Sequence, residues 1–348
     1  MVARKTTQRI IGGMFGLEDI FNPKSSNPHF LNKDAIPLLN ASSGIWLLIK
    51  ILKPTHVWMP SYLCDSMLKA VDRNLTAIRF YEVNYDLAIP SFDWILDVQQ
   101  NDLVVIIDYF GFPPDKPFIA PAKKQGAWIL EDACQALLST EVGQFSHFVL
   151  YSPRKFLGVP DGGILLLNHR INIEDIRLKR PPAAWWLKAL SASILRREHD
   201  LNGKGHRWYD LFQKIEAEYP IGPYAMSELS EMLLRHSFDY SMIIRRRIEN
   251  YHFLVEELGS IALFPKLPDR VVPLGFPIRV KNRDLLRKAL FDHKIYPPIH
   301  WPIHGIIPDE FRDSHRLSAE IMTLPCDQRC NRHDIERVIY LVSNLLGC

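Results

Sequence analysis

The stretch that decides the fold is residues 128–136, Trp128-Ile129-Leu130-Glu131-Asp132-Ala133-Cys134-Gln135-Ala136, an apolar run that ends in two carboxylates. Similar short apolar runs recur along the chain and alternate with segments of helical period, at 56–59, 77–81, 103–107, 147–151 and 164–167. Strands this apolar, separated by helices, are typical of a mainly parallel sheet that is covered on both faces. The sequence therefore predicts an α/β fold whose large domain has three layers, α/β/α.

The chain is expected to divide into three parts. A turn-rich N-terminal arm covers 1–30, the large domain covers 31–245, and a small C-terminal α+β domain covers 246–348. The small domain is inferred from a strand-like run at 271–280 and the helical segments after it. The basic and aromatic segment 180–208 is predicted to be a mobile loop near an entrance.

Composition excludes several classes of protein. The 348 residues carry 42 basic and 39 acidic side chains, a balance that gives no reason to expect a nucleic-acid partner. Five scattered cysteines do not form a disulfide framework and favour the reducing cytoplasm. No run of 18 apolar residues and no secretory segment is visible, so we expect a soluble protein without a membrane partner. No metal is expected either, because no set of cysteines and histidines has ligand spacing.

Lys155 is the residue most informative about chemistry. It lies in a turn between a strand-like run and the acidic, Gly-rich segment 158–163, about twenty residues after Asp132. Desolvation of a lysine favours the neutral amine, which forms imines. A carboxylate at a strand end suits the ring nitrogen of pyridoxal phosphate, which must stay protonated. Each residue alone has a simpler explanation, because most lysines lie at the surface and Asp commonly begins a helix.

Several candidate residues are expected to lie at the same edge of the sheet. Asp108, Asp132 and Lys155 each follow a strand-like run, and ligands bind at the carboxyl ends of parallel strands. The segment Asn40-Ala41-Ser42-Ser43-Gly44 precedes an apolar helix, whose N-terminus would attract a phosphate. The same segment would also serve as an ordinary helix cap. Gln135 lies three residues after Asp132 and could reach the phenolic oxygen of the cofactor ring.

These pieces together resemble the DegT/DnrJ/StrS family of pyridoxal phosphate-dependent sugar aminotransferases, which have the aspartate-aminotransferase fold (fold type I). Asn40-Ala41-Ser42 stands where the family has a Ser-Gly-Thr phosphate turn, and 131–136 resembles Glu-Asp-Ala-Ala-Gln-Ala. Residues 155–163 resemble the segment from the Schiff-base lysine to a Gly-Glu-Gly-Gly turn. The segment 224–229 resembles Tyr-Arg-Met-Ser-Glu-Leu, and 299–304 resembles His-Tyr-Pro-x-x-His.

The resemblance implies a set of site residues. Lys155 would be the catalytic residue that holds the cofactor as a Schiff base, and His300 and His304 would contact the substrate. The cofactor-binding residues implied are Asp132, Gln135, Asn40, Ala41, Ser42, Tyr62 and Ser152. Tyr62 would stack on the pyridine ring because Cys64 occupies the register of the usual aromatic residue, and Ser152 would supply a hydroxyl to the phosphate.

The activity implied by the resemblance is amino transfer from glutamate or glutamine to a keto-sugar nucleotide, for amino-sugar or surface-polysaccharide biosynthesis. The cofactor would alternate between pyridoxal and pyridoxamine phosphate, in a homodimer with its sites at the interface. The alternative is a catalytically impaired relative that keeps the fold and acts as a binding or regulatory subunit. It is motivated by Pro223 and Ala225, which replace an Asn and an Arg of the family. No Gly-x-Gly-x-x-Gly follows a strand, so a Rossmann dehydrogenase is set aside.

Overall fold

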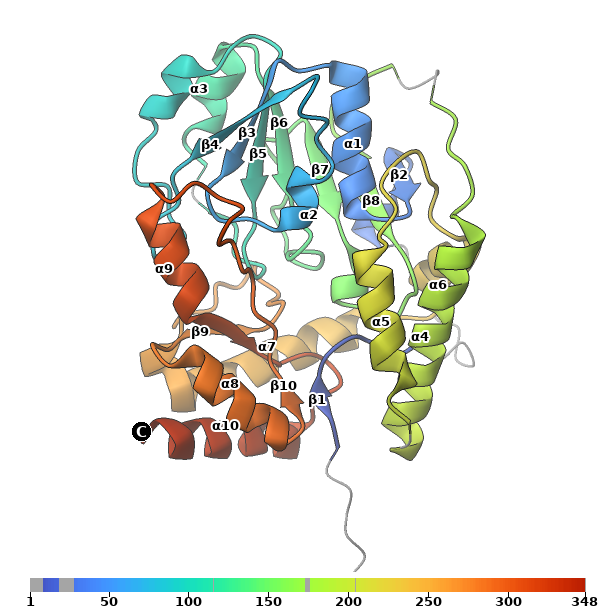
Figure 1. Ribbon diagram of the computed structural model, residues 1–348, viewed down its shortest axis with the longest axis vertical. Coiled ribbons are helices and arrows are strands. Elements are labelled where there is room, and N and C mark those ends of the chain that lie inside the picture. Colours follow the sequence, from blue (N-terminus) through green and yellow to red (C-terminus); the bar gives the residue numbers. More distant parts are fainter. Residues whose placement is uncertain (1–8, 19–27, 115, 173–175, 204, 348) are drawn as a thin grey trace, which may run out of the picture.

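Figure 1 shows the computed structural model of the chain. It describes residues 9–18, 28–114, 116–172, 176–203 and 205–347. The N-terminal arm expected over 1–30 therefore lies partly outside the described residues. None of the described helices is both long and apolar enough to span a lipid bilayer.

Within the described residues, seven strands form one central sheet in the order β2-β8-β7-β6-β5-β3-β4 (Figure 1). Parallel pairing joins β3 (His56–Pro60), β4 (Ala77–Tyr81), β5 (Leu103–Ile107), β6 (Trp128–Asp132) and β7 (Phe148–Tyr151). Two antiparallel strands complete one edge, β8 (Gly163–Leu167) and β2 (Ala35–Leu38). The mainly parallel sheet predicted from the sequence is confirmed.

The sheet is buried on both faces, which explains why its strands are so apolar. Helix α1 (Ala41–Leu52) packs against β7 and β8 on one face, and α3 (Ile119–Lys124) contacts β6 from the other. Successive residues of a strand point to opposite faces, so Val105 joins the core that contains α1. Its neighbour Val104 joins the core that contains α3. The three-layer arrangement follows directly from this alternation.

The second half of the chain forms a smaller helical layer below the strand ends (Figure 1). Its antiparallel pair is β9 (Phe276–Arg279) with β11 (Ile321–Leu324), and β1 (Ile11–Gly12) pairs in parallel with β10 (Ile295–Tyr296). The remaining helices are α2 (Asp65–Leu68), α6 (Glu228–His236), α7 (Tyr240–Leu258), α8 (Arg283–Asp292), α9 (Arg312–Glu320) and α10 (Arg332–Leu346). Short 3-10 turns occur at His29–Leu31, Asp93–Asp97, Pro153–Lys155 and Gly259–Ile261. The boundary expected at 245/246 falls inside α7.

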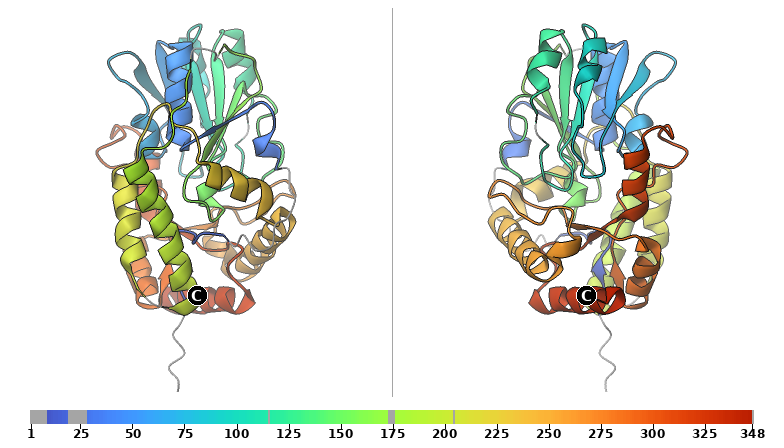
Figure 2. Two further views of the ribbon diagram at one scale, coloured as in Figure 1. Left: turned by 90° about the vertical axis from the view of Figure 1, so that its right-hand side faces the viewer. Right: turned by 90° about the vertical axis from the view of Figure 1, so that its left-hand side faces the viewer.

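The prediction of a mobile loop over 180–208 is wrong. Most of this segment is α4 (Ala183–Asn202), which lies beside α5 (Arg207–Ala217) as a helical hairpin (Figure 2). Trp185 and Ala189 are four residues apart on the buried face of α4, and the Trp185 indole N–H donates to the carbonyl of Ile215 at 3.0 Å. The basic residues hid this buried face, because two of them, Arg196 and His199, belong to it.

One close contact fixes helix α1 against the end of β8. A Cβ built on Gly163 would overlap the peptide that joins Asn40 to Ala41, so only glycine fits. The preceding N–H of Gly162 donates to the carbonyl of Leu39 at 2.8 Å. The glycine pair that follows Lys155 in sequence therefore brings the N-terminus of α1 beside the lysine turn.

We expect Gly163→Ala to lower the free energy of unfolding by at least about 2 kcal/mol, because the added methyl must displace backbone rather than a flexible side chain. Urea unfolding followed by circular dichroism measures the loss. Gly259→Ala is the matched control, since the nearest atom to its Cβ is Val255 Cγ1 at 3.9 Å, an ordinary contact. An equal loss in the two variants would contradict the steric argument.

Candidate active site

A cavity of about 1040 Å³ opens at the carboxyl ends of the parallel strands. Cys64 follows β3, Asp132 ends β6 and Ser152 follows β7, and all three line it. The remaining walls come from distant parts of the chain, namely residues 10–15, the α4–α5 hairpin and the segments 296–301 and 323–329. This position is where parallel α/β sheets bind their ligands.

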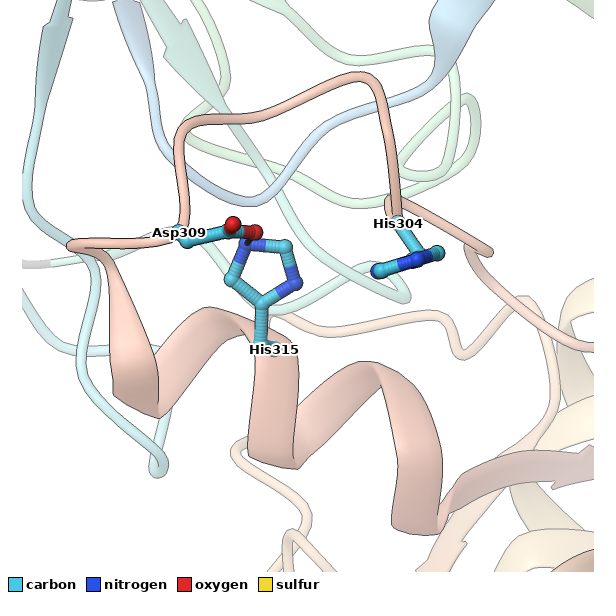
Figure 3. Close-up of side chains that lie close together, drawn as sticks. All are labelled: His304, Asp309 and His315. Carbon is cyan, nitrogen blue, oxygen red and sulfur yellow. Dashed lines mark ion pairs between the residues drawn. The ribbon is translucent and has the colours of Figure 1, made fainter.

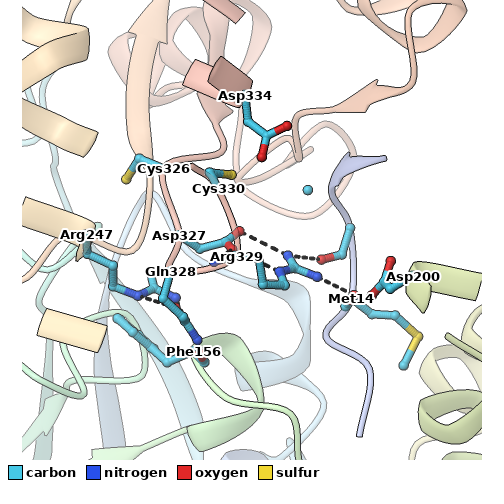
Figure 4. A network of polar contacts seen from close by, with 12 residues as sticks. Met14, Phe156, Asp200, Arg247, Cys326, Asp327, Gln328, Arg329, Cys330 and Asp334 are labelled. Atoms are coloured by element: carbon cyan, nitrogen blue, oxygen red, sulfur yellow. Dashed lines mark hydrogen bonds and ion pairs between the residues drawn. The ribbon is translucent and has the colours of Figure 1, made fainter. Parts of the chain in front are cut away.

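Lys155 ends a 3-10 turn that follows β7, and its half-buried side chain lines the cavity. The chain just after it is held by the helical layer, as Figure 4 shows. Gln328 Nε2 donates to the carbonyl of Phe156 at 2.7 Å, and Arg247 Nη2 donates to the same oxygen at 3.4 Å. The Arg247 guanidinium also lies 4.6 Å from the centre of the Phe156 ring. Residues far from the lysine in sequence thus fix the backbone next to it.

Asp132 and Gln135 both line the cavity, and each uses one side-chain oxygen in a local hydrogen bond. Asp132 Oδ1 accepts the N–H of Cys134 at 2.9 Å, while the side chain is 7% exposed. Gln135 Oε1 accepts the N–H of Phe110 at 2.7 Å. Its Nε2 is buried and has no hydrogen-bond partner among the described residues. A buried amide donor without a partner is costly, which favours an acceptor on a ligand.

The N-terminus of α1 supplies the cavity with backbone donors. Asn40 is the N-cap: its Oδ1 accepts the N–H of Ser43 at 2.8 Å, and its Nδ2 donates to the carbonyl of Pro220 at 2.6 Å. Ala41 and Ser42 line the cavity, whereas Asn40 is not among the lining residues. The alternative weighed from the sequence, an ordinary helix cap, therefore describes the Asn40 side chain. The first turn of α1 has the polarity of a helix N-terminus, which favours an anion.

Tyr62 is placed elsewhere by the structure. Its side chain is fully buried, its hydroxyl donates to the carbonyl of His300, and burial raises the pKa of the phenol. Its ring lies 5.6 Å from that of Trp301 and 5.9 Å from that of Tyr109, measured between centroids. Tyr62 is not among the residues that line the cavity, while the partly buried Cys64 is.

The two histidines of the segment 299–304 are separated. His300 lines the cavity, with Nδ1 2.9 Å from Thr323 Oγ1. Burial, reinforced by the nearby charge of Lys155, lowers the pKa of its imidazole to about 3. His304 is exposed, away from the lining residues, and lies beside Asp309 and His315 (Figure 3). The nitrogen and oxygen atoms of these three side chains that could ligate a metal lie within 4.8 Å of one another.

Asp108 follows β5 at the same edge of the sheet, but its side chain is on the opposite face from the cavity. It lies 3.4 Å from Lys116 Nζ, which also pairs with Glu131. Burial, followed by the charge of Glu131, raises the pKa of Asp108 well above its ordinary value. The period of two residues along a strand separates Asp108 and Glu131 from Asp132. Asp108 therefore lies at the expected edge of the sheet but does not line the cavity.

Sequence reasoning missed the residues that close the cavity from the side. Both Nη atoms of Arg154 donate to Glu216 Oε1 of α5 at 3.0 Å, and its guanidinium lies 5.5 Å from the centre of the Tyr219 ring. Burial outweighs the effect of the Arg154 charge and raises the pKa of the Tyr219 phenol. Arg154 was visible beside Lys155, but nothing in the sequence linked it to Glu216, 62 residues away.

The fold, together with a lysine in a cavity at the strand ends, is that of the fold type I aminotransferases. Comparison with known proteins gives the family. The model of the DegT/DnrJ/EryC1/StrS aminotransferase family matches residues 98–343. The chain belongs to this family, and it is a pyridoxal phosphate-dependent aminotransferase.

Individual proteins are similar to this chain in sequence or in fold. The erythromycin biosynthesis sensory transduction protein EryC1 of Saccharopolyspora erythraea is 23% identical over 326 residues, 88% of this chain and 81% of that protein. S. venezuelae DesV, solved in complex with a ketimine intermediate, has a TM-score of 0.65 at 16% identity over 89% of this chain and 84% of its own. The sugar aminotransferase CalS13 of Micromonospora echinospora has a TM-score of 0.63 at 12% identity, over 96% and 100%. These structures share the fold.

The residues around the cavity fit the cofactor of this family. A pyridine ring with a phenolic oxygen and a phosphate needs a carboxylate, a hydrogen-bond donor and an anion site around one amine. Asp132, the unpartnered Nε2 of Gln135 and the first turn of α1 supply these groups around Lys155. The donor set therefore matches the chemistry of pyridoxal phosphate.

Because the pKa of His300 is low in the folded protein, we expect the free energy of unfolding to depend on pH. The unfolded chain, with an ordinary histidine pKa near 6.5, binds a proton before the folded protein does. The free energy of unfolding should therefore fall as the pH drops from 6.5 toward 3, and it should fall less steeply in His300→Gln. Denaturant unfolding at several pH values measures the slope.

His304→Gln is the control, because that side chain is exposed. His147, whose pKa burial lowers to about 4, contributes to the slope in the same direction in every variant. Equal slopes in wild type and His300→Gln would show that His300 is not held neutral in the folded protein.

Proposed function

We propose that the protein transfers an amino group from glutamate or glutamine to a keto-sugar nucleotide, in amino-sugar or surface-polysaccharide biosynthesis. The observation that carries this proposal is the convergence of Lys155, Asp132 and the unpartnered Gln135 amide on one cavity beside the N-terminus of α1. The sugar acceptor is suggested by the relatives, among them CalS13, which is described as a sugar aminotransferase.

In the proposed reaction, each residue acts on a separate part of the cofactor. Asp132 would accept a hydrogen bond from the protonated ring nitrogen, which would strengthen the ring as an electron sink. Gln135 Nε2 would donate to the phenolic oxygen. The backbone of Ala41 and the hydroxyls of Ser42 and Ser152 bind the phosphate, where the helix dipole of α1 adds to their attraction.

Lys155 is the proposed general base and acid. The bound cofactor supplies an aldehyde carbon for imine formation and a ring that delocalises the electrons of a broken C–H bond. Lys155 would hold the cofactor through its amine, and its Nζ, once released by the amino donor, would take the proton from Cα of that donor and return a proton in the reverse sequence with the keto acceptor. His300, neutral in the cavity wall, is proposed to contact the substrate by hydrogen bonding rather than by charge. His304, away from the lining residues, would reach substrate only beyond the cavity.

Covalent attachment of the cofactor tests the role of Lys155. Wild-type protein incubated with pyridoxal phosphate and reduced with borohydride should carry the cofactor on the peptide that contains Lys155. Lys155→Ala should carry none, whereas Lys124→Ala, which removes an exposed lysine of α3, should label as wild type does. Labelling at another lysine, or none in wild type, would sink the assignment.

Half-transamination separates the proposed enzyme from an impaired relative that keeps the fold. Mixing the loaded protein with a panel of amino donors should convert its absorbance to that of pyridoxamine phosphate, with glutamate or glutamine the most effective. Cofactor attachment at Lys155 without conversion by any donor would instead support the binding or regulatory subunit. Pro223 and Ala225 remain the residues that motivate that alternative.

We further propose a homodimer in the cytoplasm. The dimer is proposed from the family resemblance. The cytoplasm is proposed because free thiols are typical of a reducing compartment, and Cys64, Cys134, Cys326 and Cys330 are free. Light scattering coupled to gel filtration should give twice the mass of the 348-residue chain. A fully active species with the mass of one chain would contradict the proposal.

A further inference from the structure

Most of the arginines and lysines that line the cavity are held by hydrogen bonds or ion pairs within the protein. Three of the lining cations are held by carboxylates: Lys69 by Asp65, Arg154 by Glu216 and Arg329 by Asp327. Arg247, which is fully buried, donates to Gln328 and to the carbonyls of Pro273, Leu274 and Phe156. Among the described residues, only Lys155 and Arg287 line the cavity as cations without such partners for their terminal nitrogens. Lys155 already has a role in the proposed reaction, and Arg287 has none.

Arg287 is held in place by contacts that leave its terminal nitrogens available. It lies on α8, and its Nε donates to the carbonyl of Pro297 at 2.9 Å. The guanidinium stacks on Phe291 at 4.4 Å from the ring centre. The neighbouring Arg283 differs, because it donates to Asp284 and to the carbonyls of Ser318 and Ile321. A guanidinium fixed through Nε and one face presents its two Nη groups as a fork.

The environment of Arg287 favours an anion. Burial, followed by the charge of Arg283, lowers the pKa of Arg287, and the opposing effect of Asp284 is smaller. A partly buried cation of this kind gains most from an anionic ligand, and the planar fork of arginine matches a phosphate or carboxylate. The Phe291 and Tyr296 rings, with centroids 5.0 Å apart, and the half-exposed Tyr209 add aromatic surface to the same wall.

Arg287 and Lys155 lie on different parts of the fold. Lys155 ends the turn that follows β7 of the central sheet, whereas Arg287 lies on α8, which packs against β10 and α10. The α-carboxylate of an amino donor is bonded to the carbon that reacts at Lys155, so it must bind near Lys155. The diphosphate of a sugar nucleotide is separated from the keto carbon by the sugar ring. A cavity of about 1040 Å³ is at the upper end of the range for ligand pockets and leaves space for such a substrate beside the cofactor.

We propose that Arg287 binds the diphosphate of the sugar-nucleotide acceptor, with Phe291, Tyr296 and Tyr209 as the aromatic wall for the nucleoside. This inference rests on the proposed function, because it names the residue that would select the acceptor of that reaction. It makes Arg287 a determinant of acceptor binding that takes no part in the chemistry at Lys155.

Calorimetric titration of the cofactor-loaded protein with UDP, dTDP, inorganic pyrophosphate and uridine tests the proposal. Wild type should bind at least one nucleoside diphosphate, and Arg287→Gln should bind it at least about tenfold more weakly, the effect of losing a charge-assisted bidentate contact. Arg287→Lys should recover part of the affinity. Uridine, which lacks the anion, should bind equally weakly to wild type and Arg287→Gln.

Lys288→Gln is the matched control. It removes one positive charge from the next position of the same helix, where the side chain is exposed and does not line the cavity. It should bind the diphosphates as wild type does. Thermal unfolding of each variant, followed by circular dichroism, shows whether a loss of affinity is a loss of fold.

The donor half-reaction keeps this proposal distinguishable from the proposed function. Conversion of the loaded protein by glutamate should be unchanged within about twofold in Arg287→Gln, since Arg287 is assigned to the acceptor. Equal UDP and dTDP affinities in wild type and Arg287→Gln, binding of neither by wild type, or a selective loss of the glutamate reaction would each overturn the assignment. Absence of conversion by any donor in wild type would sink the proposed function instead, while the calorimetric result for Arg287 would still stand.

Discussion

The contact between Gly163 and the peptide joining Asn40 to Ala41 is the constraint on which the site depends. It is possible only without a side chain at 163, and it places the N-terminus of α1 against the turn that follows Lys155. The same turn contains Asp161, which accepts hydrogen bonds from the Ser227 N–H at 2.8 Å and the Trp186 indole N–H at 3.3 Å. Sheet, α1, α4 and the start of α6 therefore meet at one short segment of chain.

The lysine is also held from the other side. The carbonyl of Phe156 receives hydrogen bonds from Gln328 and Arg247, and the adjacent Arg329 bonds to Asp327 and to the carbonyl of Met14 (Figure 4). This polar network links the N-terminal segment, the helical layer and the lysine turn. The proposed role of Lys155 requires such support, because a site is effective only when its backbone is fixed by surrounding residues. The buried Arg247 is explained by this structural task.

The sequence predicted the fold more completely than the site. The mainly parallel sheet followed from the apolar runs and was confirmed by the structure. Lys155, Asp132, Gln135, Ser42 and Ser152 line one cavity, although their roles remain proposals. Three expected residues, Asn40, Tyr62 and His304, do not line this cavity. Asn40 turns toward the backbone as an N-cap, Tyr62 is fully buried with its hydroxyl on the carbonyl of His300, and His304 is exposed. Such preferences depend on neighbours that a sequence pattern does not contain.

What the sequence determined by itself was the set of residues with chemistry at strand ends, because alternation, helix caps and glycine turns are local properties of the chain. Only the tertiary structure decided which of them share a cavity. Asp108 and Asp132 lie on opposite faces of the sheet, and His304 is exposed whereas His300 lines the cavity. The structure also brought Arg287 and Glu216 to the walls from distant segments. Their contribution depends on packing between elements far apart in the chain, which no local pattern encodes.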